Sequence, residues 1–201
     1  VFYEMNQGDS SGVPQSPLSI HINFRSHSGV LEVASVVLKI LHDAFPGAAN
    51  KLRGDEGLFK GPRPCILSRK GEKVLGLEAL VELLKKNPSL VLLTPDENTE
   101  KLKNGLAELL GKNFVDDLVL LGICEAKGMD YDEVVVVNFF SSASKATAKG
   151  WKELFRQEMK ENRSADLSLQ ENYPELEMRL KLLYTAITRC RHRLFFVETK
   201  P

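Results

Sequence analysis

Three arginines stand close together near the carboxyl end of the chain, directly after a predicted helix. The apolar residues of this helix recur at helical spacing, namely Leu176, Leu180, Leu183 and Ile187. The pattern ends at Thr188 and Arg189, and an apolar run from 194 to 197 predicts a strand immediately afterwards. A guanidinium at such a boundary can bind a phosphate or a carboxylate through two parallel hydrogen bonds. Alternatively, Arg189, Arg191 and Arg193 only complement the negative end of the helix dipole.

Two other stretches also place charged residues beside predicted helices or strands. Arg25 follows a short β-branched segment and stands just before an apolar stripe of helical spacing. In the middle of the chain, Lys127, Gly128 and Asp130 lie in a short loop between two apolar runs. A glycine in such a loop allows the backbone to come close to a ligand.

In this order, the three stretches resemble motifs IV, V and VI of the second RecA-like domain of superfamily 1 helicases of the UvrD/Rep type. The residues that carry the resemblance are Asn23-Phe24-Arg25-Ser26, Ala126-Lys127-Gly128-Met129-Asp130-Tyr131 and Tyr184-Thr185-Ala186-Ile187-Thr188-Arg189. The residues around them are most similar to the helicase-like region of TPR and ankyrin repeat-containing proteins. The resemblance extends from about Ile20 to Glu198, which is nearly the whole chain.

The resemblance implies that the chain supplies half of an ATPase site. In such helicases, the arginines of motifs IV and VI reach across a cleft to the γ-phosphate of ATP. The ATP, with Mg²⁺, is bound mainly by the first RecA-like domain. The corresponding residues here are Arg25 and Arg189. An arginine finger contributes about 10³–10⁵ to the rate. The alternative for each arginine is an ion pair with a carboxylate on a neighbouring element.

The resemblance also implies nucleotide-binding roles for four residues. Asp130 stands where the family usually has a glutamate that contacts the ribose, but it is one methylene shorter, and a solvated loop carboxylate is equally consistent. Gly128 would allow close approach of the backbone to the nucleotide. Lys127 would reach a phosphate or remain a surface lysine. Thr188 would orient Arg189, or it would bond back to a carbonyl at the helix end.

The sequence departs from the family just before Lys127. The family often has threonine and histidine there, in contact with the nucleic-acid strand, whereas this chain has Ile123-Cys124-Glu125. We therefore expect strand contact at this motif to be weakened or rebuilt. The basic residues around Lys149 and around Arg191 are alternative phosphate contacts, although a solvated charged surface is the commoner explanation.

The sequence contains no phosphate-binding loop of the form G-x-x-x-x-G-K-[ST] and no convincing pair of carboxylates for Mg²⁺. No metal site is predicted. We expect the isolated chain neither to bind Mg-ATP tightly nor to hydrolyse it.

Strands that are apolar throughout alternate with amphipathic helices, which predicts an α/β fold with a parallel sheet and helices on both faces. The resemblance of the three motifs implies that this α/β fold is RecA-like. Ligands of such sheets bind beyond the carboxyl ends of the strands, so we expect the three motifs to meet at that edge. Residues 1–17 are polar and predict a flexible arm, and residues 18–201 predict one domain.

The bulk composition sets further limits. The 201 residues include 27 basic and 27 acidic side chains, which argues against a strongly basic nucleic-acid-binding protein but not against a local basic groove. Three scattered cysteines favour a reducing, intracellular compartment. No apolar run approaches membrane length, so no membrane partner is expected. The chain begins with Val1, which favours a fragment of a longer protein.

Three hypotheses follow. The first is the carboxyl-terminal half of an ATP-dependent helicase or translocase, whose partners are a first RecA-like domain and a nucleic-acid strand, single-stranded DNA or RNA. The second is a catalytically inactive interaction module derived from such a domain. The third, a free-standing nucleotide-binding protein, is disfavoured because no Gly-rich turn joins a strand to a helix.

Overall fold

The computed structural model describes residues 22–48, 55–67, 76–158 and 168–198, so the predicted arm of residues 1–17 lies outside the described residues. The helices are α1 Ser28–Ala44, α2 Gly76–Lys86, α3 Thr99–Leu110, α4 Lys112–Asp116, α5 Lys145–Glu158, α6 Ser168–Asn172 and α7 Pro174–Ile187, with a 3₁₀ turn, η1, at Asp96–Asn98. The strands are β1 Ile22–Asn23, β2 Glu56–Gly57, β3 Cys65–Leu67, β4 Val91–Thr94, β5 Leu120–Gly122, β6 Tyr131–Val137 and β7 Cys190–Val197.

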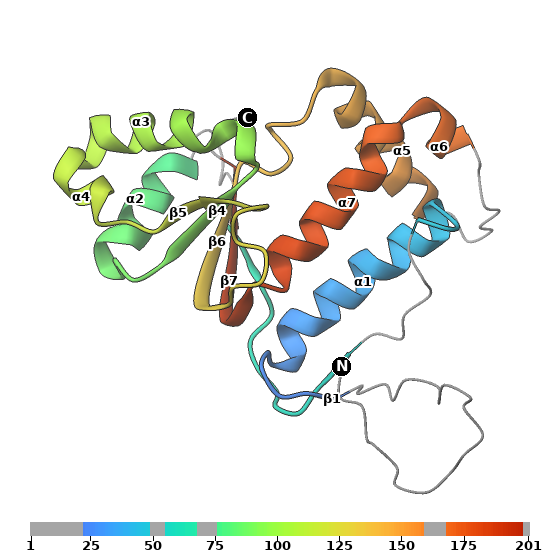
Figure 1. The fold of residues 1–201 in the computed structure, drawn as a ribbon, viewed down its shortest axis with the longest axis horizontal. Coiled ribbons are helices and arrows are strands. Elements are labelled where there is room, and N and C mark those ends of the chain that lie inside the picture. Colours follow the sequence, from blue (N-terminus) through green and yellow to red (C-terminus); the bar gives the residue numbers. More distant parts are fainter. Residues whose placement is uncertain (1–21, 49–54, 68–75, 159–167, 199–201) are drawn as a thin grey trace, which may run out of the picture.

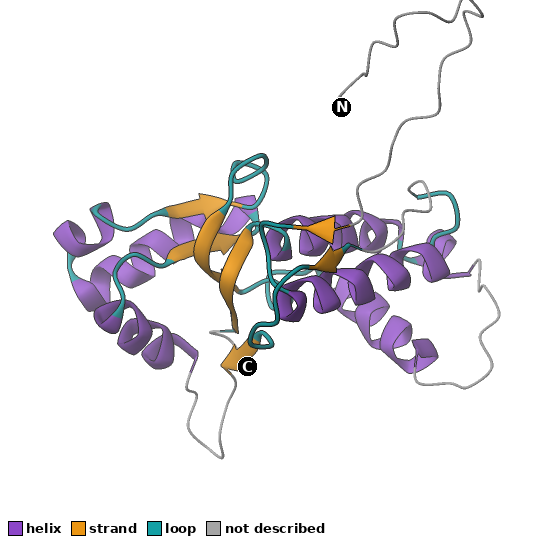
Figure 2. Cartoon of the chain, turned by 90° about the horizontal axis from the view of Figure 1, so that it is seen from below, coloured by secondary structure: helices purple, strands orange, loops and turns teal. Residues whose placement is uncertain are grey.

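Five of these strands form one sheet in the order β3-β7-β6-β4-β5, and every neighbouring pair is parallel. Strand β6 lies at the centre, where Val134 pairs with Val91 of β4 and with Leu194 of β7. Helices pack on both sides of the strands (Figure 1, Figure 2). The prediction of an α/β fold with a parallel sheet between two helical layers is confirmed. The short strands β1 and β2 form a separate parallel pair.

The second half of the central strand, residues 134–137, is apolar because both of its faces are covered. Val134 and Val136 face the cluster formed with α1, α5, α6 and α7, whereas Val135 and Val137 face the cluster formed with α2, α3 and α4. All four valines are fully buried. Successive side chains of a strand point to opposite faces, so this pattern divides the core into two layers.

Helix α7 is the element that carries the last motif. Pro174 stands in its first turn, where a missing N–H costs nothing, and Glu175 and Glu177 suit its positive end. Leu176, Leu180 and Leu183 are buried against the sheet and α1. The helix therefore presents its carboxyl end, with Thr188, directly at the start of β7.

No helix among the described residues is both long and apolar enough to cross a membrane.

Candidate functional site

Asp130, Arg189 and the turn that carries Arg25 meet at the amino edge of the sheet, opposite to the edge that the sequence predicted, whereas Lys127 lies in the turn after the carboxyl end of β5. Asp130 immediately precedes β6, and Arg189 immediately precedes β7. The two strands start side by side, because Tyr131 pairs with Cys190. This edge lies toward the bottom of Figure 1, near the start of α1. The expectation of the carboxyl edge is wrong for Asp130 and Arg189 because both residues precede a strand, and Arg25 follows β1, which is not part of the five-stranded sheet.

A tight turn shapes the backbone at Arg25. The side-chain oxygen of Asn23 accepts hydrogen bonds from the backbone N–H groups of Arg25 and Ser26, each at 2.9 Å. The Asn23 amide donates to Asp55 at 3.0 Å, which attaches the turn to the segment before β2. The Arg25 side chain is exposed. This local network fixes the backbone of Arg25 and leaves its guanidinium free to reach outward.

The next two residues fasten this turn to β7. The Ser26 hydroxyl donates to the carbonyl of Cys190 at 2.8 Å, and the His27 ring is hydrogen-bonded to the carbonyl of His192. Both side chains are buried, with 4% and 8% exposed. A Cβ at position 61 would lie 2.2 Å from the His27 ring, so only glycine fits there. The turn that carries Arg25 is therefore attached to the strand that follows Arg189.

Arg189 is held by three uncharged acceptors. Its Nε donates to the carbonyl of Thr185 at 3.2 Å, and its Nη1 donates to the carbonyl of Met129 at 2.7 Å. Its Nη2 donates to the hydroxyl of Thr188 at 3.2 Å. That hydroxyl also donates to the carbonyl of Thr185 at 3.0 Å, so Thr188 both orients Arg189 and bonds back at the helix end. The guanidinium is thus anchored without being neutralised.

The charges of Arg25 and Arg189 act on each other. Burial lowers the pKa of Arg189, and the charge of Arg25 is the second cause, while Asp130 opposes both. Burial raises the pKa of Tyr184, the negative charge of Asp55 raises it further, and the charges of both arginines act on its phenol in the opposite direction. The structure therefore brings Arg25, Arg189, Asp130 and Tyr184 into one electrostatic neighbourhood. Within the described segments, neither Arg25 nor Arg189 forms an ion pair.

The two arginines that follow are neutralised by carboxylates of β6 and the loop before it. Arg191 places both Nε and Nη2 at 2.6 Å from Oδ2 of Asp130, and its Nη1 lies 3.6 Å from Asp132. Arg193 forms an ion pair with Glu133. Asp130 is thus an ion-paired carboxylate at the start of β6. The carboxylate ion pair that was the alternative for Arg25 and Arg189 is not formed by either residue within the described segments, whereas Arg191 and Arg193 do form such pairs.

Lys127 and Gly128 lie in the loop before Asp130. Gly128 has a φ of +89°, which favours glycine, and no atom lies within 4 Å of the position where a Cβ would stand. The Lys127 side chain is exposed, and it has no ion pair among the residues that the structure describes. The glycine is therefore explained by its backbone conformation, and this surface is open to a ligand.

Carboxylates occupy the carboxyl end of β5, where the family has threonine and histidine. Glu125 accepts a hydrogen bond from the backbone N–H of Gly122 at 2.9 Å, and Asp96 accepts one from Cys124 at 3.3 Å. A Cβ at position 122 would lie 2.0 Å from the Asp96 carboxylate. These negative charges make this end of the sheet a poor place for a phosphate backbone.

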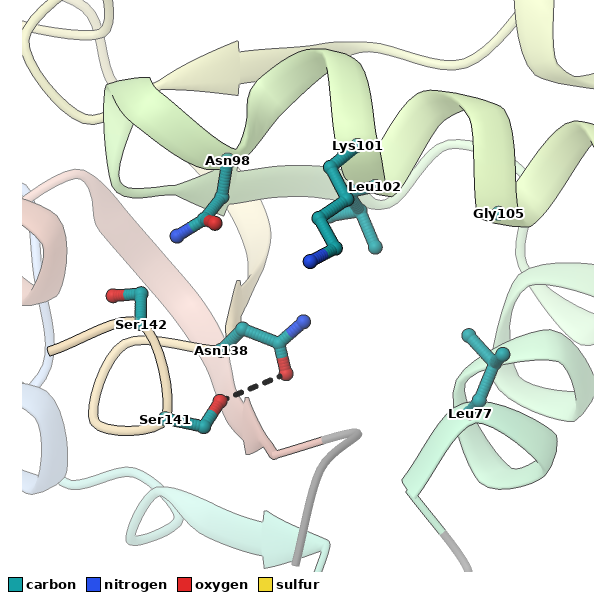
Figure 3. Close-up of a pocket in the computed structure, with 8 residues that line it drawn as sticks. All are labelled: Leu77, Asn98, Lys101, Leu102, Gly105, Asn138, Ser141 and Ser142. Carbon is teal, nitrogen blue, oxygen red and sulfur yellow. Dashed lines mark hydrogen bonds between the residues drawn. The ribbon is translucent and has the colours of Figure 1, made fainter.

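A small pocket of about 120 Å³ opens near the carboxyl end of β6 (Figure 3). It is lined by Leu77, Asn98, Lys101, Leu102, Gly105, Asn138, Ser141 and Ser142. The side-chain nitrogen of Asn98 is buried without a hydrogen-bond partner in the described part of the chain. None of the residues that the sequence predicted for nucleotide binding lines this pocket, which lies at the opposite edge from Asp130 and Arg189.

We expect the three cysteines to react at very different rates with a thiol reagent. Burial raises the pKa of Cys190 to about 12, and a hydrogen bond with Asp96 is the main cause that raises the pKa of Cys124. Because the thiolate is the reactive form, Cys65 should react first at about pH 8, Cys124 more slowly, and Cys190 only after unfolding. A colorimetric thiol count, with urea-unfolded protein as the control, checks this order. Reaction of all three thiols at one rate in the folded chain would contradict it.

Known proteins support part of the sequence interpretation. No protein-family model matches the chain. The chain is 32% identical, over 222 aligned residues, to TPR and ankyrin repeat-containing protein 1 from Homo sapiens. The alignment covers 96% of the chain but only 7% of that relative's length.

The structure is similar to the crystal structure of the C-terminal domain of a possible DNA helicase from Lactobacillus plantarum WCFS1, with a TM-score of 0.50. The match covers 87% of this chain and 86% of that one, at 18% sequence identity. At this identity the likeness shows the fold alone. The chain therefore has a helicase-like α/β fold, the RecA-like fold that the motifs predicted.

Proposed function

We propose that this chain is the second RecA-like domain of an ATP-driven motor of the UvrD/Rep type. In this role it supplies Arg25 and Arg189 to ATP held by a first RecA-like domain, and it helps to bind a nucleic-acid strand. The observation that carries the proposal is the pair of neighbouring arginines that form no ion pair in the described segments, although the charge of Asp130 acts on Arg189, beside two arginines that are ion-paired.

Electrostatics explains why this pair favours an external anion. Two like charges that act on each other destabilise the chain unless an anion lies between them. The sequence provides Asp130 for Arg191 and Glu133 for Arg193, but no comparable partner for Arg189. A terminal phosphate, with several negative oxygens, would accept hydrogen bonds from Arg25 and from the N–H groups of Arg189 that its three internal hydrogen bonds leave unused.

The anchoring of Arg189 suits a group that acts on a transition state. Its three hydrogen bonds fix the plane of the guanidinium before any ligand arrives. A donor that is already oriented costs little reorganisation when negative charge develops on the transferred phosphoryl group. Arg25 and Arg189 would therefore stabilise the γ-phosphoryl group as its bond to the leaving oxygen breaks.

The residues around the pair fit the phosphates of ATP but not its metal. Among the described residues, no group of three His, Cys, Asp or Glu side chains is placed to hold a metal ion. ATP with Mg²⁺ would supply the phosphoryl group and the charge that neutralises its leaving oxygens. In this proposal the Mg²⁺ ligands and the phosphate-binding loop belong to the first RecA-like domain.

The remaining predicted residues have secondary roles in the proposal. Thr188 orients Arg189, and Gly128 leaves open space for a nucleotide beside Lys127. Asp130 binds Arg191 through Oδ2. A contact with the ribose would use its other carboxylate oxygen, Oδ1.

We expect the isolated chain to show no ATPase activity, because it has no phosphate-binding loop of its own. A steady-state phosphate-release assay on the purified chain, with and without single-stranded DNA, measures this. The Arg25→Lys and Arg189→Lys double variant serves as the matched blank for contaminating activity. Turnover that follows the parent chain through every column, and disappears in the double variant, would refute the proposal of a half-site.

A second candidate function, an inactive interaction module, is favoured by one specific observation. Asp96 and Glu125 occupy the end of β5, where the family contacts nucleic acid. This function predicts that a full-length protein containing the chain neither binds nor hydrolyses ATP. A nucleotide-binding measurement on that protein distinguishes the two functions.

A further inference from the structure

Helix α5 carries a row of lysines on its outer face. Lys145, Lys149 and Lys152 are exposed and stand four and three residues apart, so they form one stripe along the helix. Trp151 and Leu154 are buried on the opposite face. The helix lies on the same side of the sheet as α7 and away from α2, α3 and α4 (Figure 1).

An aromatic ladder runs beside this lysine stripe. The ring of Trp151 stacks on that of Phe155, with centroids 5.9 Å apart and an angle of 22° between the planes. The rings of Trp151 and Phe140 also pack in a T-shaped arrangement, with centroids 5.2 Å apart, and Phe140 packs in the same way on buried Phe139. Phe155 and Phe140 remain 46% and 36% exposed. The rings of Phe140 and Phe155 are therefore partly exposed to solvent beside the helix that carries the lysine stripe.

The lysines lack local counter-ions in the described part of the chain. The nearest acidic residue on the helix surface, Glu153, is paired with Arg156 at 2.6 Å. Glu175, at the start of α7, keeps its negative charge near the start of α5, where it accepts hydrogen bonds from Thr147 at 2.6 Å and from Ser144 at 3.4 Å, but it forms no ion pair with the three lysines in the described residues. The three lysines without ion pairs in the described segments therefore make this face of the helix locally positive, although the whole chain has a formal charge of zero.

We propose that the lysine stripe of α5 and the exposed rings of Phe140 and Phe155 form a binding surface for a single-stranded nucleic acid. The inference rests on the proposed function and names the part of this chain that would contact the strand. Phosphates would lie along Lys145, Lys149 and Lys152, and unpaired bases would stack on the outer rings. A positive track beside exposed aromatic rings is the combination that binds single strands without reading their sequence.

The same reasoning explains why the strand would not follow the end of β5. Asp96 and Glu125 place negative charge there, and their carboxylates already hold the backbone N–H groups. A basic stripe alone would fit any polyanion, including an acidic protein segment. The exposed rings favour a ligand with flat apolar faces, which a nucleic-acid strand has at every base.

The test uses labelled oligo-dT of about 20 nucleotides and the purified chain, with binding followed by fluorescence anisotropy. Trp151 is the only tryptophan and packs on both Phe155 and Phe140, so its emission reports on changes around these two rings. We expect quenching on binding, and a slope of log K against log salt of about −2, because each phosphate contact by a single strand contributes about −0.7.

Matched variants locate the surface. Replacing Lys145, Lys149 and Lys152 by alanine should abolish the salt dependence and weaken binding at low salt by at least about tenfold. Replacing Lys85, Lys86 and Lys112, on the other side of the sheet, removes the same charge and should leave binding within about twofold. Equal losses in the two triple variants, or no binding of oligo-dT by the parent at low salt, would overturn the proposal.

The aromatic part has its own control. Phe155→Leu should weaken oligo-dT binding by about fivefold or more and leave binding of inorganic polyphosphate, which has no bases, unchanged. Equal effects on both ligands, or polyphosphate binding as tight as oligo-dT, would identify a general polyanion surface, such as one for an acidic protein, and refute the nucleic-acid proposal. Arg25→Gln with Arg189→Gln should bind oligo-dT normally, so failure of the ATPase proposal is distinguishable from failure of this one.

Discussion

Arg189→Lys is expected to lower ATP turnover by orders of magnitude in a full-length protein that hydrolyses ATP, on the scale of the about 10³–10⁵ that an arginine finger contributes. Lysine keeps the positive charge but loses the planar group that now binds Thr185, Met129 and Thr188 together. The free energy of unfolding should change by only about 1 kcal/mol, because the residue is half-buried at a helix end and the dipole still meets a cation. Steady-state ATPase kinetics beside thermal melting measure both effects.

Two comparisons separate catalysis from folding. Arg25→Lys should lower turnover in the same way, whereas Arg191→Lys alters an arginine that is already paired with Asp130 and should affect turnover far less. Nucleotide binding should change much less than turnover in every variant, because the proposed role of the arginine pair is to stabilise the transition state. Parent-like turnover in both Arg25→Lys and Arg189→Lys would favour the interaction module.

Phe139→Ala is expected to destabilise the chain by about 3–5 kcal/mol, the range for truncating a fully buried phenylalanine. Its side chain is 0% exposed and lies just beyond the end of β6, where it meets Phe140 and Trp151. The cavity left behind would loosen the packing of α5 on the sheet. Denaturant unfolding followed by Trp151 fluorescence gives the free energy of unfolding of both proteins.

Phe140→Ala is the matched control for this prediction, because Phe140 is the neighbouring residue of the same type but is 36% exposed. It should cost clearly less than Phe139→Ala. An equal loss in the two variants would contradict the division between a core ring and a surface ring on which the stacking proposal depends.

The helices and the central strands could be predicted because their residues repeat with a clear period. The stripe of α1, the stripe of α7 and the four consecutive valines of β6 each bury one face or both faces against a neighbour. The two-layer α/β arrangement follows from these patterns. The short helices α4 and α6 have no such period, and tertiary packing decides them.

The edge of the sheet at which the motifs meet was predicted wrongly, although the sequence contained a signal for it. Asp130 directly precedes β6 and Arg189 directly precedes β7, so both residues lie at the amino ends of strands. The rule that ligands bind beyond the carboxyl ends of strands applies to residues in the segments that follow a strand.

Contacts between distant parts of the chain could not be predicted from the sequence. The Ser26 hydroxyl donates a hydrogen bond to a carbonyl 164 residues away. The residues around Ser26 in the sequence do not indicate this partner. The pairing of Asp130 with Arg191 depends on the register that sets Tyr131 opposite Cys190. A single sequence carries no record of that register, so the difference between paired and unpaired arginines appeared only in the structure.

The most direct test of the central claim is an NMR titration of the arginine Nε–H signals of this chain with ATP at millimolar concentration. The signals of Arg25 and Arg189 should shift together, because both guanidinium groups are without an ion pair in the described structure and are proposed to bind the same phosphate group. The signals of Arg191 and Arg193 should stay in place, because Asp130 and Glu133 already bind them. Equal shifts of all four arginines, or no shift of Arg25 and Arg189, would contradict a phosphate-binding pair at the amino edge of the sheet.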